Sequence, residues 1–203
     1  MYIPKHFRAE NEEEIFSFMQ QYSFATIVTA KNNLPIATHL PFTVSRKEGR
    51  ITMAAHFAKA NDQWKDLDGG RVLVIFSEPH AYISPKHYDK EQSVPTWNYI
   101  SVHAYGNASL VSEPGAAMAM LEDMINQYEP GYKVQWDGLP LEFKLKMLNG
   151  IVAFEIHVDD LQAVQKLSQN KSAVEQKRIV DTLSASPHES EKKIAEYMAR
   201  NLE

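Results

Sequence analysis

The sequence predicts a mainly β, α+β protein, built as a barrel or sandwich with helices at its periphery. Strand-like runs rich in β-branched residues recur along the chain, for example at residues 24–30 (FATIVTA) and 71–77 (RVLVIFS). Turn residues separate these runs, as they do around residues 47–49. Short strands with turn signals between them favour a barrel or sandwich over a layered α/β sheet.

The other strands are expected from the same composition, and one of them contains an informative glycine. They cover residues 34–44, 50–55, 98–111 and 151–158, and residues 81–84 either extend the run at 71–77 or restart it after Pro79. Gly106 lies inside the run 98–111, where a glycine is typical of a bulge or of close approach by another backbone.

Helices are predicted near the start of the chain and between the strands. Asn11 is a suitable N-cap for a first helix, because three glutamates follow it at the positive end of the helix dipole. Apolar residues from Ile15 to Tyr22 then recur at helical spacing. Further helices are expected at residues 58–68, 114–128 and 140–148.

A pair of helices is expected to close the chain. Ser172 with Glu175, and Ser186 with Glu189, each match the capping-box pattern of a helix start. Pro187 would then occupy the first position of the last helix.

Composition excludes several classes of protein. The chain has no cysteine, which excludes disulfides, thiolate nucleophiles and cysteine metal sites and fits a reducing compartment. No basic start precedes an apolar run, and no stretch reaches the roughly 18 apolar residues of a membrane span, so we expect a cytoplasmic protein with no membrane contact. The net charge of −5 lowers the expectation of a dedicated DNA binder.

Motifs of common enzymes are also missing. The eight histidines form no HExxH pattern, which argues against a zinc hydrolase. The chain contains no GxSxG, Walker A or GxGxxG motif, which argues against nucleotide hydrolysis and nicotinamide binding. No metal site is predicted, and no catalytic acid or base is marked out.

Three segments have a composition suited to ligand binding. Residues 53–64 place His56 and Lys59 where a strand ends and a helix is expected to begin, a common anion site. Residues 79–106 concentrate aromatic side chains in a loop and strand, which is equally typical of a structured loop and of a wall for a flat ligand. Residues 166–172 (KLSQNKS) are polar and precede a helix.

Taken in order, these segments resemble the PaiB family of FMN-binding split-barrel proteins. The matching pieces span nearly the whole chain: MYIPKHF (1–7), ATHLPF (37–42), KANDQW (59–64), PHAYISPKHY (79–88), VPTWNY (94–99), VHAYG (102–106) and KLSQNKS (166–172). The resemblance implies an FMN-binding split β-barrel of pyridoxamine-phosphate oxidase type over residues 1–168, with peripheral helices. Residues 169–203 would be a C-terminal helical extension packed on the barrel. The resemblance also implies a homodimer with the flavin at its interface.

The resemblance further implies which residues contact the cofactor. The phosphate side corresponds to Thr52, His56, Lys59 and Asn61. The wall near the ring system corresponds to Trp97, Asn98, Ser101 and His103. A third group of contacts would come from Lys166, Gln169 and Asn170, in the same or the partner subunit.

The function implied is negative regulation of transcription, affecting sporulation and the synthesis of degradative enzymes, including proteases. DNA binding would be weak or indirect, because residues 166–203 carry seven basic against six acidic residues. Two alternatives stay open, a flavin-dependent oxidoreductase acting on a small molecule and a haem-binding split barrel, because related barrels have many functions.

Overall fold

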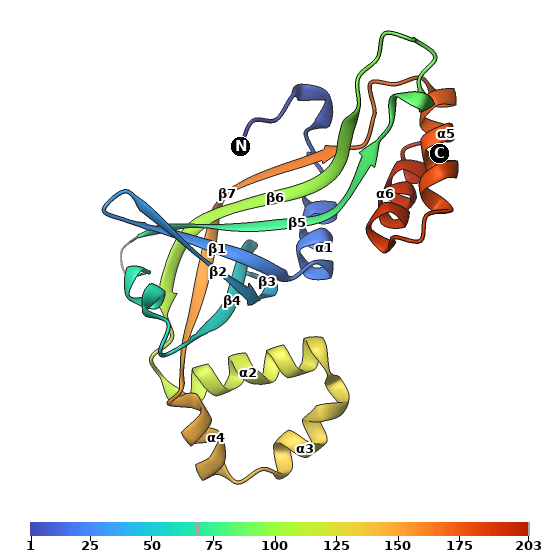
Figure 1. Ribbon diagram of the computed structural model, residues 1–203. Helices are drawn as coiled ribbons and strands as arrows, with labels where there is room; N and C mark the ends of the chain where they lie inside the picture. The colour runs from blue at the N-terminus through green and yellow to red at the C-terminus, as the bar shows by residue number, and fades with distance from the viewer. Residues whose placement is uncertain (68–69, 203) are drawn as a thin grey trace. The chain divides into compact units, whose positions relative to one another are not determined.

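The computed structural model describes residues 1–67 and 70–202, and its strands form one antiparallel sheet (Figure 1). The strands are β1 (Phe24–Lys31), β2 (Leu34–Pro41), β3 (Thr43–Lys47), β4 (Arg50–Ala58), β5 (Arg71–Ile83), β6 (Thr96–Leu110) and β7 (Ile151–Lys166). Their order in the sheet is β2-β1-β5-β6-β7-β4-β3. Residues 81–83 extend the run at 71–77 as one strand, and the mainly β prediction is confirmed.

Helices occupy most of the predicted positions. They are α1 (Glu12–Gln21), α2 (Pro114–Tyr128), α3 (Lys133–Gly138), α4 (Leu141–Leu148), α5 (Ala173–Ser184) and α6 (Glu189–Arg200). The Asn11 side chain accepts hydrogen bonds from the amides of Glu13 and Glu14, which confirms the predicted cap of α1. α3 was not expected from the sequence.

The two predicted capping boxes have different outcomes. Ser172 and Glu175 form the box at the start of α5, as predicted. The box at Ser186 and Glu189 is wrong, because α6 begins at Glu189 with His188 as its N-cap. The Ser186 hydroxyl instead accepts a hydrogen bond from the amide of His188, at 3.1 Å, and so shapes the turn before the helix.

The helix expected at residues 58–68 is also different. The chain makes a short 3-10 helix, Asp62–Asp66, and residue 68 lies outside the described residues. The Asn61 side chain accepts from the amide of Gln63, two residues on, so the turn is tight and local. Gly69 and Gly70 follow in the sequence and disfavour a longer helix.

The chain divides into two compact units, and each combines distant segments. Unit 1 contains Met1–Ile15, Ser77–Val102 and Gln162–Glu203, and unit 2 contains Phe16–Phe76 and His103–Leu161. The predicted boundary at residue 168 stays a prediction.

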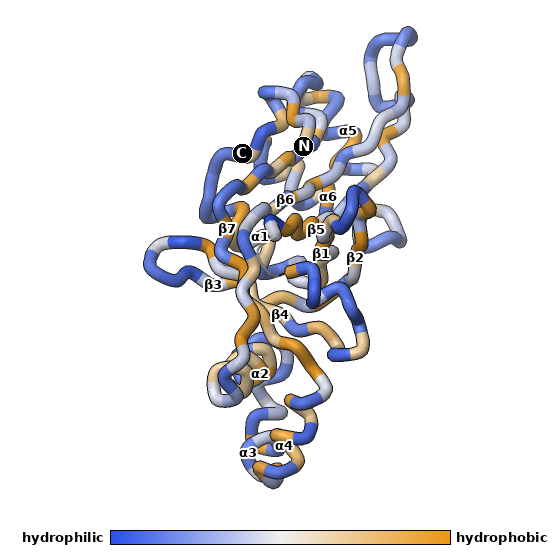
Figure 2. Tube along the Cα trace, turned by 90° about the vertical axis from the view of Figure 1, so that its left-hand side faces the viewer, coloured by the Kyte–Doolittle hydropathy of each residue, from blue (hydrophilic) through white to orange (hydrophobic). Residues whose placement is uncertain are grey.

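Unit 2 has an aromatic core. The rings of Phe57 and Phe154 stack with their centroids 5.1 Å apart, and Phe42 packs edge-on against Phe154 at 6.3 Å. Figure 2 shows hydrophobic stretches along β4, β7 and α2.

Unit 1 contains the C-terminal helical pair. α5 and α6 pack on each other (Figure 1), and Ile179, Ile194 and Met198 are fully buried there. Burial of these side chains stabilises the pair, by about 25 cal/mol per Å² of apolar area.

Gly106 lies where β6 meets β7, as predicted for a close backbone approach. A Cβ atom added to Gly106 would lie 2.2 Å from the carbonyl oxygen of His157. Only glycine fits this point of the strand pair.

Among the helices of the described part of the chain, none is long and apolar enough to span a membrane.

Candidate functional site

The residues predicted to contact the cofactor lie in both units. Thr52, His56, Lys59, Asn61 and His103 belong to unit 2, and the other six belong to unit 1. Each group is described within its own unit.

Strand β4 presents Thr52 and His56 on the face opposite the aromatic core. Side chains alternate along a strand, and the core residues Met53, Ala55 and Phe57 occupy the other face. Thr52 is opposite His157 of β7 and is only 1% exposed, yet its hydroxyl has no hydrogen-bond partner in the described part of the chain. A buried hydroxyl without a partner is unfavourable, which makes this atom a candidate for ligand contact.

His56 lies beneath α2. It lines a small void together with Met120, Leu121 and Met124 of that helix, and the void has no room for a water molecule. Burial lowers the pKa of His56, so its imidazole is neutral at pH 7. The structure thus places His56 against a helix rather than in an open cleft.

Lys59 and Asn61 follow β4 and differ in what their side chains do. The Asn61 side chain donates from its amide nitrogen to the Thr38 hydroxyl at 3.0 Å. Its carbonyl oxygen accepts from the backbone amide of Gln63 and so caps the 3-10 helix. Both polar atoms of this side chain are therefore used within the fold. The expected anion site at a helix start is therefore not supported, because Asn61 already satisfies the amide of Gln63. Lys59 is exposed, and its side chain is the part of the predicted anion site that could still bind an anion.

Spacing along the chain separates Thr52 from Lys59. Seven residues at about 3.3 Å each give roughly 23 Å between their Cα atoms. One phosphate group therefore cannot contact both side chains, and a single ligand could reach both only if it lay along β4.

Strand β6 divides the predicted ring-contacting residues between its two faces. Trp97, Ser101 and His103 share one face by alternation, whereas Asn98 is on the other. Asn98 is completely buried, where its carbonyl oxygen accepts from the Ser168 hydroxyl and its amide contacts the sulfur of Met198. Its position is that of a core residue.

An exposed aromatic group surrounds Trp97 in unit 1. Trp97 is 52% exposed, and its ring centroid lies 5.9 Å from those of both His80 and Tyr82. This surface could pack against a flat ring or another apolar surface.

His103 provides a second orphaned polar atom, in unit 2. Its Nδ1 is buried and has no hydrogen-bond partner among the described residues. Burial lowers the pKa of His103, so the neutral imidazole offers one donor and one acceptor.

The end of β7 and the loop after it use most of their polar side chains in internal contacts. Lys166 donates to the hydroxyl of Thr96, and burial lowers its pKa. The Gln169 side chain accepts from the amide of Leu167 at 2.8 Å and donates to the carbonyl of Gln165 at 2.5 Å. Asn170 is exposed, so its side chain could contact a ligand.

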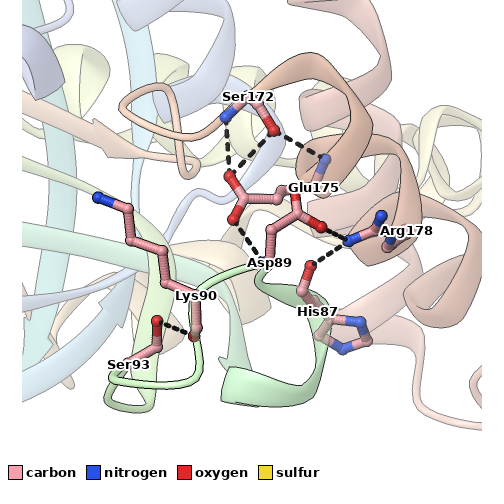
Figure 3. A network of polar contacts seen from close by, with 7 residues as sticks. All are labelled: His87, Asp89, Lys90, Ser93, Ser172, Glu175 and Arg178. Carbon is pink, nitrogen blue, oxygen red and sulfur yellow. Dashed lines mark hydrogen bonds and ion pairs between the residues drawn. The ribbon is translucent and has the colours of Figure 1, made fainter.

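A polar network that the sequence did not reveal fixes the loop before β6 to α5 (Figure 3). The Glu175 carboxylate accepts from the amide of Asp89 at 3.0 Å, and Arg178 pairs with the Asp89 carboxylate at 2.5 Å. Arg178 also donates to the carbonyl of His87 at 3.3 Å. The partners are 86 to 91 residues apart in sequence, so no local pattern predicts their pairing.

The donor set contains groups of the kinds that a flavin needs. No cluster of three or more histidine or acidic side chains suited to a metal exists within residues 1–67 and 70–202. A flavin needs an aromatic or apolar surface, donors for its carbonyls and a cation for its phosphate. In unit 2, the orphaned atoms of Thr52 and His103 are polar groups and Lys59 is a cation; in unit 1, Trp97 is an exposed aromatic group.

The strand order and the solved structures with the same fold define a split β-barrel. Two are the flavocytochrome Anf3 from Azotobacter vinelandii and the FAD and heme binding protein from Mycobacterium smegmatis. The first is 17% identical, with a TM-score of 0.63, covering 81% of this chain and 72% of that one. The second is 14% identical, with a TM-score of 0.64, covering 84% and 78%. At such identities the likeness shows the fold alone.

Sequence comparison gives the family. The chain belongs to the family described as "Putative FMN-binding domain", whose model matches residues 1–160. It is 42% identical over 205 residues to the "Protease synthase and sporulation protein PAI 2" of Bacillus subtilis (strain 168), covering all of this chain and 98% of that protein. An uncharacterized protein of Emericella nidulans, AN0679, is 26% identical over 81% of this chain and 84% of its own length. The recognised resemblance to PaiB is confirmed.

Proposed function

We propose that the chain is an FMN-binding homodimer that negatively regulates transcription, lowering the synthesis of degradative enzymes and repressing sporulation. The observation that carries this proposal is the full-length similarity to PAI 2, whose name links it to protease synthesis and sporulation. The family match to an FMN-binding domain supports the cofactor.

The residues present fit a flavin, although the contact set is smaller than the sequence suggested. Lys59 would bind the phosphate, because it is an exposed cation beside the strand end. Thr52 and His103, which belong to the same unit as Lys59, would supply polar contacts. Bound FMN would supply redox chemistry to the protein, while these side chains bind and orient it.

A titration with FMN tests the cofactor, read by absorbance and flavin fluorescence alongside light scattering for the mass. We expect one FMN per subunit bound by a dimer. Lys59→Ala should weaken binding by about 1–2 kcal/mol, the scale of a charge-assisted hydrogen bond. Lys65→Ala is the matched control, because Lys65 is a nearby lysine that pairs with Asp62 at 2.6 Å. Equal affinities for the two variants would place the phosphate elsewhere.

Regulation needs separate measurements. Transcripts of secreted proteases should rise when the gene is deleted and fall when the wild-type gene is restored. A regulator should not consume NADH or NADPH in the presence of FMN, whereas sustained turnover with a small substrate would favour an oxidoreductase. No effect of deletion on protease transcripts would contradict the regulatory role.

A further inference from the structure

A cavity of about 520 Å³ lies within unit 2, among α2, α4 and the neighbouring ends of β4, β6 and β7. Apolar side chains form most of its wall: Leu110, Ala117, Leu145, Leu148, Ile151 and Val152. Its volume falls in the range of roughly 300–1,000 Å³ typical of small-molecule sites. Walls of this kind favour a ligand with an apolar body.

Lys59 provides the charge at this cavity, and its backbone is held on two sides. Its amide donates to the carbonyl of Gly150 at 2.8 Å, and its own carbonyl accepts from the indole of Trp64 at 3.2 Å. Trp64 also lines the cavity. The lysine side chain therefore starts from a fixed point of the wall, which reduces the entropy lost when it binds a ligand.

The polar groups of the cavity suit an anion with a single charge. Within the described residues, no carboxylate makes an ion pair with Lys59. Ser112 and Asn149 are the other polar side chains of the wall, apart from Trp64, and both are neutral. Among the described residues that line the cavity, Lys59 is the only cation, and one cation balances a single negative charge.

We propose that this cavity binds a small monoanion with an apolar body, such as an aliphatic or aromatic carboxylate, with its charged end on Lys59. The apolar body would lie between α2 and α4, against Leu148 and Val152. This site does not depend on flavin binding, but both ligands would use Lys59 and would compete.

The test uses 8-anilinonaphthalene-1-sulfonate, a fluorescent monoanion with an aromatic body, bound to the full chain. Octanoate should displace the probe, and octanol, which is similar in size but neutral, should do so about tenfold less well. Lys59→Gln should weaken probe and octanoate binding about tenfold while leaving octanol nearly unchanged. Equal displacement by octanoate and octanol would overturn the proposal.

Two substitutions on α4 locate the probe. Leu145 lines the cavity and is 41% exposed, so Leu145→Asp should be tolerated by the fold and should repel the anion. Leu141 is 65% exposed on the same helix and does not line the cavity, so Leu141→Asp is the matched control. We expect weaker probe binding for Leu145→Asp alone, and equal effects would show that the probe binds elsewhere.

The same variants separate this proposal from the flavin proposal. Leu145→Asp should weaken FMN binding less than it weakens probe binding, because only the phosphate of FMN would approach Lys59, whereas the whole probe would lie in the cavity. If it weakened FMN and the probe equally, the cavity would belong to the cofactor and this inference would be overturned. Probe binding without FMN binding would overturn only the flavin proposal.

Discussion

Replacement of Gly106 by alanine should test the close contact between β6 and β7. The new Cβ would meet the His157 carbonyl oxygen at 2.2 Å and its carbon at 2.9 Å, and both are backbone atoms that cannot rotate away. Contacts of 3.4 Å or more are ordinary, so the strands would have to separate by about 1 Å. Overpacking of this kind usually costs about 1–3 kcal/mol, and we expect the upper end of that range.

Thermal unfolding and urea denaturation are suitable assays. For a chain of this length, about 3 kcal/mol corresponds to a fall in Tm of roughly 6–12 °C. Gly138→Ala is the matched control, because Gly138 ends α3 and a Cβ there would meet nothing within 4 Å. That variant should keep its Tm or gain slightly. An unchanged Tm for Gly106→Ala would refute the reasoning from the strand contact.

Three further predictions follow from buried or capped polar groups. Asn98→Ala should lower the free energy of unfolding by about 1–3 kcal/mol, because the substitution leaves the Ser168 hydroxyl buried without its acceptor. Urea denaturation measures this loss, and an unchanged free energy would mean that the loop rearranges. Hydrogen bonds from the amides of Asp89 and Ser172 lower the pKa of Glu175, so its contribution is present above the ordinary glutamate pKa and is lost as the pH falls through the lowered value. The stability difference between wild type and Glu175→Gln should therefore be visible at pH 7 and vanish in acid, and a constant difference would contradict this account. Burial lowers the pKa of His56, so stability should decline as the pH falls below about 6.5, and His56→Gln should flatten that decline in denaturation curves measured from pH 7 to 5.

Local patterns predicted most of the secondary structure. The cap at Asn11 and the capping box at Ser172 were confirmed because each depends on residues a few positions apart. The box at Ser186 failed because the same hydroxyl can serve a turn before the helix, and sequence alone does not separate these two uses. The expected helix at residues 58–68 failed for a similar reason, since the Asn61 side chain favours a tight turn.

The candidate site was predicted less completely than the fold. Strand alternation alone would have separated Asn98 from Trp97, because neighbouring residues of a strand face opposite sides. The sequence could not show that a side chain such as that of Gln169 bonds within the protein, because its partners are set by the loop conformation. The cavity beside Lys59 could not be predicted from the sequence either, because its walls come from segments that lie up to about ninety residues apart in the chain.

The interleaving of the two units bears on how the protein is made. Unit 2 ends at Leu161, whereas unit 1 also requires residues 162–203. During synthesis, unit 2 can therefore assemble before α5 and α6 are made, although both helices bond to residues of Ser77–Val102. Until α6 leaves the ribosome, the Asn98 side chain lacks its contact with Met198, and we expect the nascent chain to depend most on chaperones in that interval.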